Sequence, residues 1–130
     1  MTAYPTVDEI VAAHARMIAQ FGGSTGIRDR GALESAAARP QSGYYQDHIQ
    51  EAAALWESLS QNHPCLDGNK RTAVTVAAAF LKVNGIRLEF DDAEAYQFLI
   101  GLYESGRMRF RELETWLRAH AAPSPGGPRS

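Results

Sequence analysis

The stretch that organises this chain is residues 63–73, which read HPCLDGNKRTA. An Asp-Gly pair favours a tight turn, and the glycine, Gly68, permits a positive φ or a close approach of the backbone to a ligand. Asn69 then has a suitable side chain to cap a helix. The residues that follow, up to Val83, are apolar on nearly every side of a helical wheel, which is typical of a central buried helix. The stretch therefore predicts a turn that leads into a helix over residues 69–83.

The same stretch concentrates side chains that suit a phosphate group. The N–H groups at a helix start attract anions, and Lys70 and Arg71 would add two positive charges there. Asp67 is a carboxylate of the kind that holds Mg²⁺ beside substrate phosphates. His63 has an ordinary pKa near neutrality, so it could accept a proton from an attacking hydroxyl. The residue types alone leave two interpretations open, a phosphate site and a charged helix start with an ordinary turn.

Other polar residues indicate no second site. His14 lies on the apolar face of the first expected helix, where a hydrogen-bonded core histidine is a simpler interpretation than a catalytic group. Cys65 lies two residues from His63, but no third group that would orient a Cys–His pair is evident, and a structural role suffices. The four histidines and one cysteine have no spacing typical of metal ligands.

Apolar residues recur at helical spacing along most of the chain. A capping box at residues 6–9, Thr-Val-Asp-Glu, predicts the start of the first helix, and Gly22 predicts its end. Residues 41–48 are polar and aromatic and predict a loop or a short hairpin. Signals for a parallel sheet are absent, so the expected fold class is all-α. The expected helices span about residues 7–21, 30–39, 49–62, 69–83, 91–105 and 110–121.

Length and composition indicate one globular domain. The 130 residues are 45% hydrophobic and 22% charged, with a formal net charge of −2, which argues against a protein whose main task is to grip nucleic acid. The sequence has neither a signal peptide nor an apolar run of about 18 residues that could span a membrane. A single cysteine fits a reducing compartment. We expect a folded domain over residues 1–121 and a disordered tail, rich in Pro, Gly and Ser, over residues 122–130.

The stretch 63–73 resembles the signature of the Fic/Doc superfamily, also called Fido, whose pattern is HPFx(D/E)GNGRxxR. The death-on-curing, or Doc, branch carries lysine where the AMP-transferring Fic enzymes carry the second glycine, and this chain has Lys70 there. The final arginine of the pattern is absent, since Val74 occupies its place. Both differences favour the Doc branch. Cys65 stands where the family has a phenylalanine whose ring anchors the loop.

The resemblance extends to other parts of the chain. FGGSTGIRD at residues 21–29, ALESA at residues 32–36 and KVNG at residues 82–85 are similar to the corresponding parts of Doc-like chains. In all, the likeness covers roughly residues 6–120. It implies a compact helical bundle in which a central buried helix follows the motif loop, and it makes residues 1–121 a Doc/Fic-like catalytic domain.

In function, the resemblance implies a toxin of a type II toxin–antitoxin module in the bacterial cytoplasm. Such a toxin is a kinase that transfers the γ-phosphate of ATP, with Mg²⁺, to a Thr or Ser hydroxyl of a translation factor of the elongation factor Tu kind, and it thereby stops translation. The implied partners are a cognate antitoxin and that translation factor, without direct binding of nucleic acid or membrane. The implied roles are general base for His63, Mg²⁺ ligand for Asp67, and nucleotide and phosphate binding for Gly68, Asn69, Lys70 and Arg71.

Two alternatives remain open. One is AMP or other nucleotidyl transfer on the same fold, against which Lys70 and Val74 weigh, since Lys70 fills space that glycine leaves open in AMP-transferring relatives. The other is a non-catalytic module that holds an antitoxin, which Cys65 in the place of phenylalanine keeps open. No inhibitory motif is evident within the chain. We therefore expect a separate antitoxin to bind as an extended or helical segment across an apolar groove beside the motif loop, near residues 43–45 and the first two helices.

Overall fold

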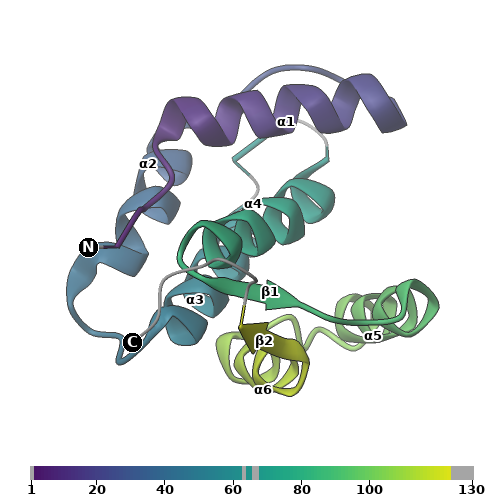
Figure 1. Ribbon diagram of the computed structural model, residues 1–130. Helices are drawn as coiled ribbons and strands as arrows, with labels where there is room; N and C mark the ends of the chain where they lie inside the picture. Colours follow the sequence, from purple (N-terminus) through teal and green to yellow (C-terminus); the bar gives the residue numbers. More distant parts are fainter. Residues whose placement is uncertain (1, 63, 66–67, 124–130) are drawn as a thin grey trace.

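The computed structural model describes residues 2–62, 64, 65 and 68–123. The all-α expectation is confirmed, and each expected helix begins and ends within one residue of its predicted bounds (Figure 1). No helix in these ranges combines the length and the apolarity needed to cross a bilayer. In chain order the elements are α1 (Val7–Phe21), α2 (Arg30–Ala38), the 3-10 helix η1 (Arg39–Ser42), α3 (His48–Gln61), α4 (Asn69–Val83), β1 (Ile86–Leu88), α5 (Asp92–Glu104), α6 (Phe110–His120) and β2 (Ala121–Pro123).

The core is built around α3, which packs along both α4 and α6. Ten of the fourteen residues of α3 are buried, because alanines at positions 52–54 allow the neighbouring helices to approach closely. α4 packs on it through Ala73, Ala77 and Phe80, all of which are buried. The outer side of α4 is open at Val83, which is 62% exposed. The helix that follows the motif loop is therefore central, as expected, while α3 is the more completely enclosed of the two.

α1 crosses the start of α4 (Figure 1). Its capping box is present as predicted: the Thr6 hydroxyl accepts a hydrogen bond from the Glu9 N–H at 3.1 Å, and the Glu9 carboxylate accepts one from the Thr6 N–H at 2.9 Å. α2 is capped in a similar way by the Asp29 carboxylate, which accepts from the Ala32 N–H at 3.0 Å. These caps set where α1 and α2 begin, and thereby which faces of these helices meet the core.

Two expectations about irregular segments need correction. Residues 43–47 contain no strand, and Gly43 ends η1 in a left-handed conformation, so the segment before α3 is a loop and the hairpin alternative is wrong. Ala122 and Pro123 are part of β2, which pairs antiparallel with β1. The ordered domain thus continues two residues past the expected boundary at residue 121, because the chain adds a strand to β1 after α6. The rest of the expected tail, residues 124–130, lies outside the described residues.

α1 lies close to the start of α4 at Gly68, which immediately precedes α4. Gly68 has φ 72° and ψ 16°, a left-handed conformation that glycine adopts at little cost. A Cβ atom on Gly68 would lie 3.2 Å from Cδ1 of Ile18 and 3.8 Å from the His14 ring. Both α1 residues are buried. Glycine is therefore required here for two reasons. The backbone has a left-handed conformation, and α1 leaves no room for a side chain at this position.

We predict that Gly68→Ala destabilises the fold more than Gly43→Ala does. Gly43 also has a positive φ, of 82°, but its added Cβ would meet no atom within 4 Å, so that variant should lose only the backbone term of about 1–2 kcal/mol. Gly68→Ala adds a clash with a buried side chain, at about 1 kcal/mol or more. Urea unfolding of both variants measures the difference, and equal losses would show that α1 does not restrict the turn.

Candidate functional site

The structure describes four of the six residues that the sequence predicts for the site. Gly68, Asn69, Lys70 and Arg71 lie together at the start of α4. The expected general base, His63, and the expected metal ligand, Asp67, lie outside the described residues. The architecture around them is nevertheless defined by Pro64 and Cys65 on one side and by α4 on the other.

The segment between α1 and α2 holds the beginning of the motif loop. The Pro64 carbonyl accepts hydrogen bonds from the N–H groups of Arg28 at 2.8 Å and Asp29 at 3.0 Å. Cys65 pairs with Ile27 in an isolated antiparallel bridge. Since Asp29 also caps α2, one short segment fastens the motif loop and starts a helix. Sequence reasoning missed this role of residues 27–29, although it noted that they resemble Doc-like chains.

Asn69 closes the motif loop, and the expectation that it caps α4 is wrong. The cap residue of α4 is Gly68, and Asn69 is the first helical residue. The Asn69 side-chain amide accepts a hydrogen bond from the Cys65 N–H and donates one to the Cys65 carbonyl, both at 2.9 Å. The two bonds join the ends of the turn. The amide that could have capped the helix is thus used to fix the loop, because the left-handed turn at Gly68 moves the helix start by one residue.

No side chain among the described residues caps α4, whose N-cap residue is Gly68. The first N–H groups of a helix have no partner within the helix, so they need a side chain, water or a ligand. Where no side chain is used, the helix start and its dipole can bind an anion. This backbone arrangement is the one that the predicted phosphate site requires.

Lys70 and Arg71 lie in the first turn of α4 and are both exposed. Neither forms an ion pair with a described residue. Each instead lies over an aromatic ring: Nζ of Lys70 is 4.2 Å from the centre of the Tyr103 ring, and Cζ of Arg71 is 4.3 Å from the centre of the Phe21 ring. Such contacts stabilise by about 0.5–1 kcal/mol at exposed positions. The positive charge at the helix start is therefore not neutralised by a described carboxylate.

Sequence reasoning did not find Tyr103 or Phe21. Tyr103 belongs to α5 and Phe21 is the last residue of α1, so neither is near the motif in sequence. The Tyr103 hydroxyl donates a hydrogen bond to Oγ of Ser60 at 3.1 Å, and burial raises the pKa of Tyr103, which therefore stays neutral at physiological pH. No local pattern signals either contact, since both depend on how three helices pack.

Cys65 and His14 have environments that favour structural roles. Cys65 is 2% exposed, and burial raises the pKa of its thiol, which disfavours the thiolate that a nucleophile needs. This geometry argues against the Cys–His interpretation. His14 is 3% exposed, as expected for a core histidine, but its ring lies against Gly68, closer to the site than its place on α1 suggests.

The site fits a phosphate chain better than the described residues fit a metal. Backbone N–H groups and two cations are suitable phosphate partners. Among residues 2–62, 64, 65 and 68–123, no group of three or more His, Cys, Asp or Glu side chains could hold a metal ion. Mg²⁺ is usually held by one or two carboxylates together with the phosphates of the substrate, and the metal role expected of Asp67 stays a prediction.

Comparison with known proteins agrees with the motif. Residues 4–81 match the model of the Fic/DOC family. The chain is 41% identical over 96 residues to Toxin Doc of Mycolicibacterium smegmatis, an alignment that covers 70% of this chain and 72% of the relative. It is 31% identical over 98 residues to Protein kinase doc of Escherichia phage P1, which covers 72% of this chain and 77% of the relative. With its lysine in the loop and its helical bundle, the chain belongs to the Fic/DOC family, in the Doc branch.

Proposed function

We propose that this chain is a Doc-type toxin that transfers the γ-phosphate of ATP to a Thr or Ser hydroxyl of a translation factor resembling elongation factor Tu. The observation that carries the proposal is the start of α4, where no side chain caps the helix and two cations lack ion-pair partners among the described residues. The likeness to a relative named Protein kinase doc supports the choice of reaction.

The residues of the site suit phosphoryl transfer. This reaction needs positioning and charge neutralisation more than covalent help from the protein. In the proposal, the N–H groups of Gly68 and Asn69 bind phosphate oxygens, and Lys70 and Arg71 orient them and balance their charge. His63 accepts the proton of the target hydroxyl. Asp67 holds Mg²⁺, which when bound adds charge neutralisation on the phosphates.

Transfer of AMP is the competing reaction on the same fold. Lys70 and Val74 weigh against it, since both replace residues of the AMP-transferring pattern. The second competing hypothesis is a non-catalytic binding module. The reason for it is that Cys65 stands where the family has the anchoring phenylalanine. The hydrogen bonds of Cys65 with Asn69 and of Pro64 with residues 28 and 29 hold the loop without that ring, which supports a site that is built for catalysis.

Labelled ATP separates these functions. The chain is incubated with purified elongation factor Tu, bacterial extract and ATP labelled at either the γ- or the α-phosphate. We expect label on protein from the γ position alone. Label from the α position would instead mean nucleotidyl transfer, and no label from either position would contradict enzymatic transfer.

In the same assay, His63→Ala should reduce γ-label incorporation by about 10²- to 10⁴-fold, since a general base contributes roughly that much to the rate. His120→Ala, which removes an imidazole at the end of α6, is the matched control and should retain activity. Melting curves of both variants show whether the fold is kept. Wild-type activity in a folded His63→Ala variant would exclude His63 as the base.

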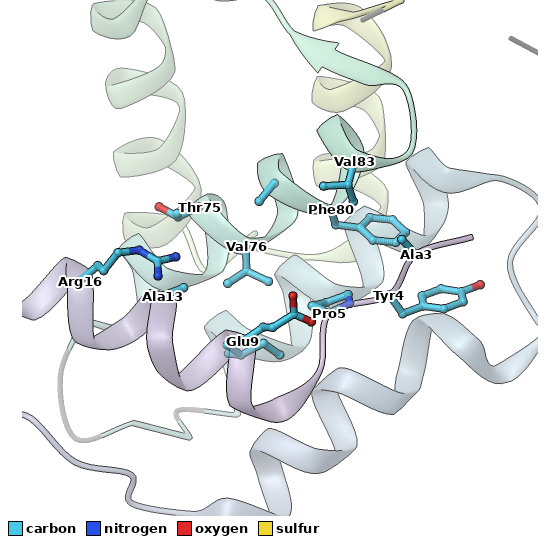
Figure 2. A pocket seen from close by; sticks show the side chains of 12 residues that line it. Ala3, Tyr4, Pro5, Glu9, Ala13, Arg16, Thr75, Val76, Phe80 and Val83 are labelled. Carbon is cyan, nitrogen blue, oxygen red and sulfur yellow. The ribbon is translucent and has the colours of Figure 1, made fainter. Parts of the chain in front are cut away.

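We propose that a separate antitoxin restrains the toxin by binding an apolar groove beside α4. The groove has a volume of about 250 Å³ and lies between α4 on one side and α1 with the N-terminal segment on the other (Figure 2). It shares α1 with the expected location, and residues 43–45 do not line it, so the expected contact with those residues stays a prediction. Its lining residues are Ala3, Tyr4, Pro5, Glu9, Ile10, Ala13, Arg16, Thr75, Val76, Ala79, Phe80 and Val83.

The wall that the N-terminal segment forms is firmly held. The Asn84 amide exchanges two hydrogen bonds of 2.9 Å with the N–H and carbonyl of Ala3. The Tyr4 hydroxyl donates a hydrogen bond to the buried Glu51 carboxylate, and the Tyr4 ring stacks on Phe80. A groove with two fixed apolar walls suits the apolar face of a segment that folds on binding.

We predict that Ala79→Glu weakens antitoxin binding at least about tenfold, because a charge would be buried without a partner when the groove is filled. Ala79 is exposed, so the free chain should fold normally. Ala119→Glu, an equally exposed change on α6, is the control. Affinity is measured by calorimetry with the purified cognate antitoxin. Equal affinities of the two variants would place the antitoxin elsewhere.

A further inference from the structure

The two cations of the motif are each held by a ring from a different helix. Lys70 lies over Tyr103 of α5, with Nζ 4.2 Å from the ring centre, and Arg71 lies over Phe21 of α1, with Cζ 4.3 Å from the ring centre. The family model matches residues 4–81 and therefore does not extend to Tyr103. The pairing of cations with rings is a feature of the folded structure of this chain.

Tyr103 is fixed to the core and does not simply cover the surface. Its hydroxyl donates to Oγ of Ser60 at 3.1 Å, and Ser60 is itself buried in α3. The ring is only partly exposed. The ring beneath Lys70 is thereby held by α3, the helix at the centre of the core.

Burial accounts for little of the position of Phe21. It is 51% exposed, at the last position of α1 before Gly22 ends the helix. A half-exposed phenylalanine gains little from burial. The recorded partner of its ring face is the guanidinium of Arg71.

These contacts reduce the cost of ordering two adjacent cations around a ligand. Lys70 and Arg71 are adjacent in sequence, carry like charges and have long, flexible side chains that lose conformational entropy when a ligand orders them. A ring that attracts each cation reduces this cost, because the side chain is already close to its bound position. The ring occupies one side of each cation, so the remaining N–H groups stay available to phosphate oxygens.

We propose that Tyr103 and Phe21 are positioning residues that hold Lys70 and Arg71 ready to receive the phosphates of ATP. The inference rests on the proposed function, since it assumes that the two cations bind the nucleotide. It adds that the affinity for ATP depends on two rings outside the motif, one of them in α5.

Two variants of Tyr103 isolate the role of the ring. Tyr103→Phe and Tyr103→Leu both lose the hydrogen bond to Ser60, but only the leucine variant loses the aromatic face. In NMR spectra of lysine-labelled protein without nucleotide, the ε-CH₂ protons of Lys70 should be shifted upfield by the ring in wild type and in Tyr103→Phe. The shift should vanish in Tyr103→Leu. An unshifted Lys70 signal in wild type would overturn the placement of Lys70 over the ring, whether or not the chain binds ATP.

Calorimetry with ATP and Mg²⁺ then tests the consequence. Tyr103→Leu and Phe21→Leu should each weaken ATP binding about two- to five-fold, which is the fold-change that a cation–π contact at an exposed site corresponds to. Tyr103→Phe should bind like wild type. So should Tyr96→Leu, which changes an exposed residue of the same helix that lies under no cation of the described residues. Melting curves confirm that the variants are folded.

The outcomes distinguish this role from the proposed function. If wild type binds ATP and both leucine variants bind it equally well, the positioning role is wrong and the proposed function stands. If Tyr103→Phe is as weak as Tyr103→Leu, the Ser60 bond and not the ring matters, which also overturns the proposal. If wild type binds no ATP, both the proposed function and this role fail.

Discussion

The arrangement of the site depends on the close contact between α1 and the turn at Gly68. Because the turn is left-handed and lies against Ile18 and His14, it sets where α4 begins. That start position makes Asn69 the first residue of the helix and directs its amide back to the Cys65 backbone. The loop closed by Asn69 and the position of Lys70 and Arg71 in the first turn of α4 both follow from this start position. A larger residue at position 68 would change each of them together.

Much of the architecture could be predicted from local patterns. The capping box at Thr6, the helical periodicity and the glycines that end helices depend on residues within one or two turns of each other. They located the six α-helices closely, but they did not predict η1. The burial of His14 followed from the same periodicity. The motif also indicated which residues gather at the start of α4, since four of them are consecutive in the chain.

What could not be predicted depends on contacts between distant segments. The amide of Asn69 could either cap a helix or close a loop, and only the position of α1 decides between them. The ring of Phe21 is 50 residues from Arg71 in the chain and the ring of Tyr103 is 33 residues from Lys70, and no local sequence pattern predicts either contact. The groove beside α4 has one wall formed by the N-terminal segment, which hydrogen bonds hold to Asn84 and Glu51. His63 and Asp67 remain predictions, since they lie outside the described residues.

α4 contributes to both the proposed phosphate site and the proposed antitoxin groove. Its first turn carries the cations, and from Thr75 onward it forms one wall of the groove.

The most direct test of the account is a crystal structure of the chain with Mg²⁺ and a non-hydrolysable ATP analogue. The account predicts the γ-phosphate against the N–H groups of Gly68 and Asn69, with Lys70 and Arg71 on its oxygens. An α-phosphate in that place, or a nucleotide bound away from α4, would contradict it.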